Sequence, residues 1–206
     1  MRKLLIPLVA LLTVACSGGS DAQVRQSVPA GTQLKTATFG GGCFWCVEEA
    51  FDKVAGVVST TSGYTGGRVA NPTYKQVSAG GTGHVEVVRV AYDPARVSYQ
   101  QLLDVFWKNV DPLTPNRQFC DGGPQYRSAI FHEDAEQGRL AEASKQALER
   151  SGRFKQPIVT EVVAASRFYP AEEYHQDYYK KNPLRYTYYK TSCGRVRRLK
   201  EVGGDA

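Results

Sequence analysis

Two cysteines three residues apart lie in the stretch FGGGCFWCVEEAF, residues 39–51. A cysteine at the start of a helix has its thiolate stabilised by unpaired backbone amides and by the helix dipole, which lowers the thiol pKa. We therefore interpret Cys43 as a candidate redox nucleophile. Cys46 follows about one helical turn later on the same side, where it could resolve a sulfenic acid by forming a disulfide.

The same cysteine pair allows three other interpretations. Cys43, Cys46, Cys120 and Cys193 could form two structural disulfides in an oxidising compartment. A bond between Cys43 and Cys46 would close a very small loop and restrain the unfolded chain little, so it suits a redox-active disulfide better than a structural one. A thiol-disulfide oxidoreductase and a metal-binding module are the remaining alternatives, although no histidine has a recognised ligand spacing from the pair.

A carboxylate in the alternating stretch HVEVVRVAYDP, residues 84–94, is the second candidate for chemistry. The period of two places Glu86 on the same face as Val88 and Val90. If that face is buried, desolvation raises the carboxyl pKa and makes Glu86 a proton donor near neutral pH. The alternation equally allows the opposite face, with Val85, to be buried while Glu86 faces water.

The elements that must position these groups follow one another in the predicted order β-α-β-β-α-β-α-β. The segments are residues 35–41, 43–54, 57–67, 84–94, 98–110, 125–132, 133–150 and 157–166. A short aromatic helix over 172–181 and an irregular, basic C-terminal tail complete the chain. This order fits an α+β fold, a ferredoxin-like two-layer mixed sheet with helices largely on one face. The loop 111–124 is longer than a compact connection needs, which is typical of a functional loop.

Length and charge limit the classes of function. A chain of 206 residues can form one domain with a sizeable core. Its net charge of +6 includes two residues of the N-terminal segment and many between 180 and 200. No basic and aromatic motif of a nucleic-acid-binding module accompanies that basic tail, so we expect no nucleic-acid partner.

The N-terminus, MRKLLIPLVALLTVACSGGS, has the layout of a secretory signal, and its apolar run is too short to span a bilayer. Its LTVAC ending resembles a bacterial lipoprotein signal, in which Cys16 would be lipidated and would anchor the protein to a membrane. Ordinary cleavage nearby, which would release a soluble periplasmic protein, is the alternative. We therefore expect export to the periplasm, with a signal peptide over 1–16, a flexible tether over 17–33 and a catalytic domain over 34–206.

Six motifs between residues 36 and 195 carry a family resemblance: GGCFWCVE, GYTGG, NPTYKQV, GTGHVE, QYRSAI and FYPAEEYHQDYY. In this order and combination they resemble peptide methionine sulfoxide reductase A. The resemblance implies an α+β fold and thiol-dependent reduction of methionine-S-sulfoxide, free or in proteins, as repair after oxidative damage. It implies no metal and no organic cofactor. Thioredoxin, or a thioredoxin-like donor in an exported protein, is the implied reductant, and we expect a monomer.

The resemblance also implies roles for individual residues. Cys43 would attack the sulfoxide sulfur and become a sulfenic acid, while Glu86 would protonate the sulfoxide oxygen, which favours burial of Glu86. The further site residues that it implies are Tyr74 and Tyr126 as hydrogen-bonding partners of that oxygen, Asp121 as a site carboxylate, and Phe44 and Trp45 as the aromatic pair that holds the substrate methyl group.

The sequence leaves open which cysteine resolves the sulfenic acid. Cys46 is nearest to Cys43 along the chain. Cys193, in the C-terminal stretch TSCGR, is the second candidate, because other members of the resembled family resolve with a C-terminal cysteine. We interpret Cys120, beside Asp121, as a small buried or spectator thiol.

Overall fold

A computed structural model describes residues 31–203, and its main feature is a mixed six-stranded sheet. The strands of this sheet are β1 (Lys35–Gly41), β2 (Val57–Thr65), β3 (Val85–Tyr92), β6 (Ser128–His132), β7 (Glu161–Ala164) and β8 (Tyr169–Pro170). Their spatial order is β7-β6-β1-β3-β2-β8. Strand β1 pairs antiparallel with β3 and β6, whereas β6 pairs parallel with β7. A separate small hairpin joins β4 (Arg117–Gln118) to β5 (Asp121–Gly122).

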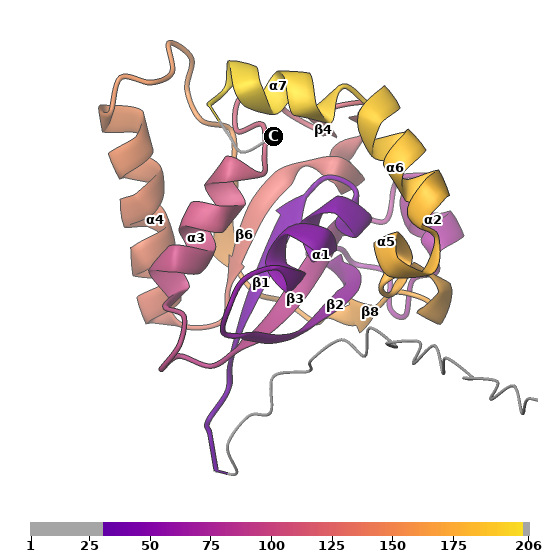
Figure 1. Ribbon diagram of the computed structural model, residues 1–206, viewed down its shortest axis with the longest axis horizontal. Coiled ribbons are helices and arrows are strands. Elements are labelled where there is room, and N and C mark those ends of the chain that lie inside the picture. Colours follow the sequence, from indigo (N-terminus) through magenta and orange to yellow (C-terminus); the bar gives the residue numbers. More distant parts are fainter. Residues whose placement is uncertain (1–30, 204–206) are drawn as a thin grey trace, which may run out of the picture.

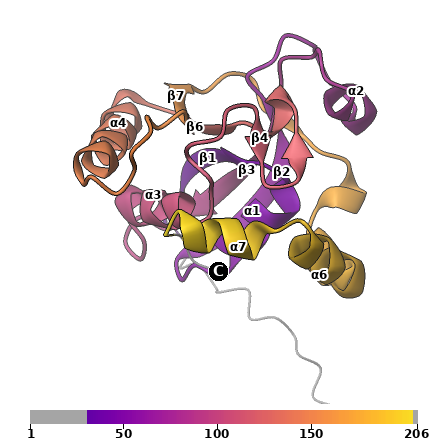
Figure 2. The same cartoon turned by 90° about the horizontal axis from the view of Figure 1, so that it is seen from above.

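Helices pack around this sheet (Figure 1). The α-helices are α1 (Phe44–Asp52), α2 (Tyr74–Ser78), α3 (Tyr99–Lys108), α4 (Ala135–Arg150), α5 (Tyr178–Lys181), α6 (Pro183–Ser192) and α7 (Arg195–Glu201). Single 3₁₀ turns occur at Pro124–Tyr126 and Glu173–His175. Helix α1 packs on β1, β2 and β3, and α4 packs on β6 and β7, with α3 between them. Figure 2 shows α7 between α3 and α6.

Stacked aromatic rings hold helices α1 and α3 against the central strand. Phe39 of β1 lies 4.8 Å, between ring centroids, from Phe51 of α1 and 5.4 Å from Phe106 of α3. All three side chains are buried, and burial of each such ring contributes about 1.5–3 kcal/mol. The N-terminus of α3 is fixed by a capping box, in which the Ser98 hydroxyl accepts from the Gln101 backbone N–H. Helices α1 and α3 are therefore both held against β1.

A second apolar cluster covers the opposite face of the sheet. It consists of Val85, Val87, Ala129 and Phe131, with Phe168 packed against it. Both faces of the first half of β3 are consequently buried, because Val88 and Val90 belong to the main core under the helices. The alternation of β3 could not reveal this, since a strand covered on both sides has no polar face.

The predicted α+β fold and its order of main elements are confirmed. Two predicted strands are shorter than expected: the segment 125–132 forms a strand only from Ser128, and 157–166 only over β7. The predicted irregular tail is wrong, because residues 183–201 form α6 and α7. These helices pack on the rest of the protein through the buried side chains of Tyr186 and Leu199. The Arg198 guanidinium also donates to the Asp111 carboxylate at 2.8 Å.

The expected signal peptide, Cys16 and most of the expected tether lie outside the described residues. Within residues 31–203, no helix has the length and apolar character needed to cross a membrane.

Candidate active site

The glycine-rich turn between β1 and α1 brings Cys43 to the start of the helix. Gly42 has φ +82°, a conformation that glycine adopts without strain, and a Cβ at this position would lie 2.4 Å from Cβ of Gln118. Cys43 follows as the N-cap residue of α1, so the predicted helix start is confirmed within one residue. Cys46 lies one turn on, and its backbone N–H donates to the Cys43 carbonyl at 3.1 Å.

The two thiols differ in charge because their neighbours differ. Burial raises the pKa of the Cys43 thiol well above its ordinary value, and the nearby Cys46, Glu86 and Asp121 add to the effect. A hydrogen bond from the Cys43 thiol lowers the pKa of Cys46 to about 6 against the cost of burial, with help from Arg195. The prediction that the helix start lowers the pKa of Cys43 is therefore wrong, because burial outweighs the helix dipole. Of the two thiols, Cys46 is therefore the more readily ionised.

Glu86 is buried, as the resemblance implied, and only 2% of it is exposed. Burial raises the pKa of its carboxyl group to about 8, although the Phe44 backbone N–H donates to it at 3.2 Å and opposes the shift. The negative charge of Asp121 raises the pKa further. Glu86 is therefore mostly protonated at neutral pH and can donate a proton.

A cavity of about 340 Å³ brings the sequence-predicted site residues together. The predicted residues that line it are Cys43, Phe44, Trp45, Tyr74, Glu86, Asp121 and Tyr126. The remaining lining residues, which the sequence reasoning missed, are Arg185, Tyr188, Tyr189 and Ser192 of α6. Their spacing of i, i+3, i+4 and i+7 marks one face of a helix, which is the signal in the sequence that identifies them.

Polar side chains on three separate elements point into this cavity. Tyr74 begins α2, and its backbone N–H donates to Glu172 at 2.8 Å. Burial raises the pKa of Tyr74 to about 12 and raises that of Tyr126 as well, so both hydroxyls remain protonated donors. Asp121 of β5 accepts a hydrogen bond from the Tyr189 hydroxyl. Burial raises the pKa of Asp121, which the Tyr189 hydrogen bond partly offsets.

The aromatic pair forms the apolar side of the cavity. The Trp45 indole stacks on Tyr178 with 3.7 Å between ring centroids, and its Nε1–H donates to Nδ1 of His175 at 3.1 Å. Phe44 is buried, with its ring 6.0 Å from that of Tyr64. Apolar surface thus lies beside the Cys43 sulfur and close to the hydrogen-bonding groups.

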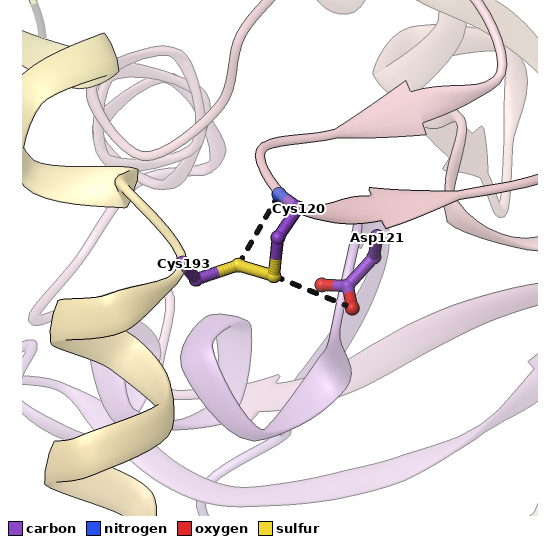
Figure 3. A group of neighbouring side chains, drawn as sticks. All are labelled: Cys120, Asp121 and Cys193. Carbon is purple, nitrogen blue, oxygen red and sulfur yellow. Dashed lines mark hydrogen bonds between the residues drawn. A yellow bond between two sulfur atoms is a disulfide. The ribbon is translucent and has the colours of Figure 1, made fainter.

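A disulfide joins Cys120 to Cys193 (Figure 3). Cys43 and Cys46 are free thiols. The interpretation of Cys120 as a buried or spectator thiol is therefore wrong. The β4–β5 hairpin exposes Cys120 at its turn beside the C-terminal end of α6, and the Cys120 backbone N–H donates to the Cys193 sulfur at 3.2 Å. The two sulfurs and the Asp121 carboxylate lie within 4.8 Å of one another. Because the two sulfurs are bonded to each other, neither is a thiolate that could bind a metal ion.

Comparisons with known proteins agree on one family. The family model of peptide methionine sulfoxide reductase matches residues 35–205. The chain is 53% identical over 163 residues to peptide methionine sulfoxide reductase MsrA of Halalkalibacterium halodurans, covering 79% of this chain and 93% of the relative. It is 47% identical over 200 residues to MsrA/MsrB of Vibrio cholerae, covering 96% of this chain but only about half (53%) of that relative.

A solved structure is similar as well. Saccharomyces cerevisiae Mxr1 in reduced form matches with a TM-score of 0.70 and 32% identity, over 74% of this chain and 88% of Mxr1. The same yeast protein in complex with Trx2 matches with a TM-score of 0.51 and 21% identity, over 74% of this chain and 90% of that chain, which shows likeness of fold alone.

Proposed function

The chain belongs to the peptide methionine sulfoxide reductase family, and we propose that Cys43 is the nucleophile with which it reduces methionine sulfoxide. The substrate is methionine-S-sulfoxide, free or in proteins, and the reaction repairs oxidised proteins. The observation that carries the residue assignment is a cavity lined by both the Cys43 thiol and a buried, protonated Glu86.

The first step transfers the sulfoxide oxygen and two electrons. Glu86 gives its proton to the sulfoxide oxygen, which makes the substrate sulfur electrophilic, and the Cys43 sulfur attacks that atom. Glu86 then regains a proton from the thiol. The hydroxyl group then moves from the substrate sulfur to the Cys43 sulfur, the bond between the two sulfurs breaks, and methionine leaves with the electron pair, so that Cys43 becomes a sulfenic acid. The raised pKa of Cys43 supports this order, because the thiol keeps its proton until the sulfoxide is polarised.

The surrounding side chains position the substrate. The Tyr74 and Tyr126 hydroxyls donate hydrogen bonds to the sulfoxide oxygen, because burial keeps both protonated. Phe44 and Trp45 provide the apolar surface that holds the methyl group. Asp121 completes the polar side of the cavity and accepts the hydrogen bond of the Tyr189 hydroxyl.

Cys46 is the resolving cysteine in this proposal. Its thiol attacks the Cys43 sulfenic acid, which forms a disulfide and releases water. The low pKa of Cys46 and its hydrogen bond with the Cys43 thiol support this role. Cys193, the second candidate, is bonded to Cys120 and could attack only after that bond opens.

A dithiol protein of the thioredoxin type then reduces the enzyme disulfide. Yeast Mxr1 has been solved in complex with Trx2, which supports a reductant of this type as the partner of this chain.

Export to the periplasm, lipidation of Cys16 and a monomeric state are part of the same proposal and rest on the sequence. Cell fractionation of the wild type and of the Cys16→Ser variant tests the lipid anchor. We expect the wild-type protein in the membrane fraction and the variant in the periplasmic fraction.

Turnover of the separate S and R epimers of a methionine sulfoxide peptide, with dithiothreitol as reductant, tests the reaction. We expect reduction of the S epimer alone. If folded protein with a free Cys43 thiol reduced neither epimer but reduced the disulfides of insulin, the chain would be a thiol-disulfide oxidoreductase that uses Cys43 and Cys46.

A further inference from the structure

The orientation of Trp45 depends on two different kinds of contact. Its indole lies on Tyr178 with an interplanar angle of 7°, and Tyr189 meets it edge-on at 5.7 Å. Stacking fixes the plane of the indole, but dispersion forces have little directionality, so the ring could still slide or rotate within that plane. A directional contact is needed to fix the remaining freedom.

His175 supplies that directional contact. Its Nδ1 accepts the hydrogen bond of the Trp45 indole N–H at 3.1 Å. The imidazole is 2% exposed and lies at the end of the 3₁₀ turn Glu173–His175. Its ring centroid is 5.0 Å from that of Phe44 and 4.3 Å from that of Tyr74. His175 thus lies behind the cavity wall, in contact with both members of the aromatic pair.

The second ring nitrogen of His175, Nε2, indicates that the imidazole is present for its hydrogen bond to Trp45. Because Nδ1 accepts, the neutral ring carries its proton on Nε2, and this atom is buried without a hydrogen-bond partner among residues 31–203. Burial lowers the pKa of His175, which favours the neutral form that can accept. An unsatisfied buried donor costs stability. The only side-chain hydrogen bond of His175 within the described residues is the one to Trp45.

We propose that His175 is a positioning residue that fixes the in-plane orientation of Trp45 and thereby makes the site discriminate between S-methyl and S-ethyl sulfoxides. This inference rests on the proposed function, in which Trp45 contacts the substituent on the substrate sulfur. Without the hydrogen bond, the indole is free to turn on Tyr178 and to admit one more methylene group.

The hydrogen bond itself can be observed without turnover. The chain has two tryptophans, and the Trp107 indole N–H donates to the Ser144 hydroxyl at 2.8 Å, outside the site. In ¹H–¹⁵N spectra of the reduced full chain, His175→Leu should shift the Trp45 indole resonance upfield and leave that of Trp107 in place. His175→Asn should keep the Trp45 shift, because Asn Oδ1 can accept from nearly the position of Nδ1.

The kinetic consequence is a change of selectivity. The ratio of kcat/KM for S-methyl over S-ethyl sulfoxide, measured with methionine and ethionine sulfoxides, should fall about tenfold in His175→Leu, the low end of what one methylene is worth. His175→Asn should restore the ratio. The matched control is His84→Leu, which removes another buried imidazole. That imidazole is hydrogen-bonded to the Gly67 backbone N–H and to the Val69 carbonyl. It should lower the melting temperature but leave the ratio and the Trp45 resonance unchanged.

The outcomes separate this inference from the proposed function. An unchanged Trp45 resonance or an unchanged ratio in His175→Leu would overturn the inference, as would an equal loss of selectivity in His84→Leu. Wild-type protein that reduces neither sulfoxide would instead overturn the proposed function.

Discussion

At the scale of single residues, the two active-site thiols are distinguished by their burial and by the charges around them. Burial raises the pKa of Cys43 and the negative charge of Asp121 adds to the effect, whereas the cationic Arg195 and Lys190 help to lower the pKa of Cys46. Like charges disfavour a thiolate and opposite charges favour it. The Cys43 thiol therefore holds its proton more strongly than the Cys46 thiol does.

The first prediction separates the nucleophile from the resolving cysteine. Cys43→Ser should abolish turnover, because the serine hydroxyl is a far weaker nucleophile. Cys46→Ser should release about one equivalent of methionine but recycle poorly with a thioredoxin-type reductant. Quantifying methionine after a single addition of sulfoxide measures this. Wild-type activity in Cys43→Ser would refute the nucleophile, and unimpaired recycling in Cys46→Ser would move the resolving role to Cys193.

The second prediction concerns the proton on Glu86. Only its protonated form can donate to the sulfoxide oxygen, and the carboxyl group titrates at a pKa of about 8. In a background with Cys43→Ser and Cys46→Ser, which removes the titration of both thiols, affinity for a methionine sulfoxide peptide should be constant below that pH. Above it, affinity should weaken by about tenfold per pH unit. Calorimetric titration measures this, and the added change Glu86→Gln should make the profile flat. A pH dependence that survived Glu86→Gln would rule out this group.

At the scale of elements, α1 carries a second buried carboxyl group outside the cavity. Glu48 is 1% exposed, and one of its carboxyl oxygens is buried without a partner within the described residues. Burial raises its pKa to about 7, and the charges of Asp52 and Asp177 add to the effect. A group whose pKa is raised in the folded state stabilises the protein while it is protonated. That stabilisation is complete below pH about 4.5 and is lost as pH rises through 7.

The third prediction follows for Glu48→Gln, which cannot ionise. Relative to wild type, the variant should gain stability between pH 5 and pH 8, by about 3 kcal/mol at most. Urea unfolding of both proteins at the two pH values gives this difference, in which the other titrating groups cancel. An equal stability difference at both pH values would show that Glu48 does not titrate in this range.

At the scale of the whole molecule, the C-terminal helices are fastened over the site by contacts distant in sequence. The Cys120–Cys193 disulfide spans 73 residues and joins the β4–β5 hairpin to the end of α6. Nearby, the Arg198 guanidinium donates to Asp111, and the Tyr189 hydroxyl donates to Asp121. One wall of the cavity is therefore built by the last twenty described residues packing on the loop 111–124.

The fourth prediction concerns this fastening. Cys120→Ser should lower the free energy of unfolding by about 2–4 kcal/mol, the usual effect of losing a disulfide that closes a long loop. Cys193 then becomes a free thiol, so the denatured variant should react with one more equivalent of thiol reagent than wild type. Chemical reduction of wild type should reproduce the loss of stability. If wild type and Cys120→Ser unfolded at the same denaturant concentration, the disulfide would not stabilise the fold.

The sequence by itself determined the main elements and most of the site. The glycine turn before Cys43, the strand around Glu86 and the order of strands and helices follow from local patterns, and the structure confirms them. The motifs also identified the seven predicted residues that line the cavity. These features could be predicted because each depends on neighbouring residues or on a continuous motif.

Only the tertiary structure decided what depends on distant contacts. The burial of Glu86 needed coverage of its face of β3, which segments distant in sequence provide. The pairing of Cys120 with Cys193 and the α6 wall of the cavity depend on the chain returning to the loop 111–124. The pKa of Cys43 rises rather than falls because burial outweighs the local helix dipole. Burial is a property of the whole packed molecule, so local sequence does not specify it.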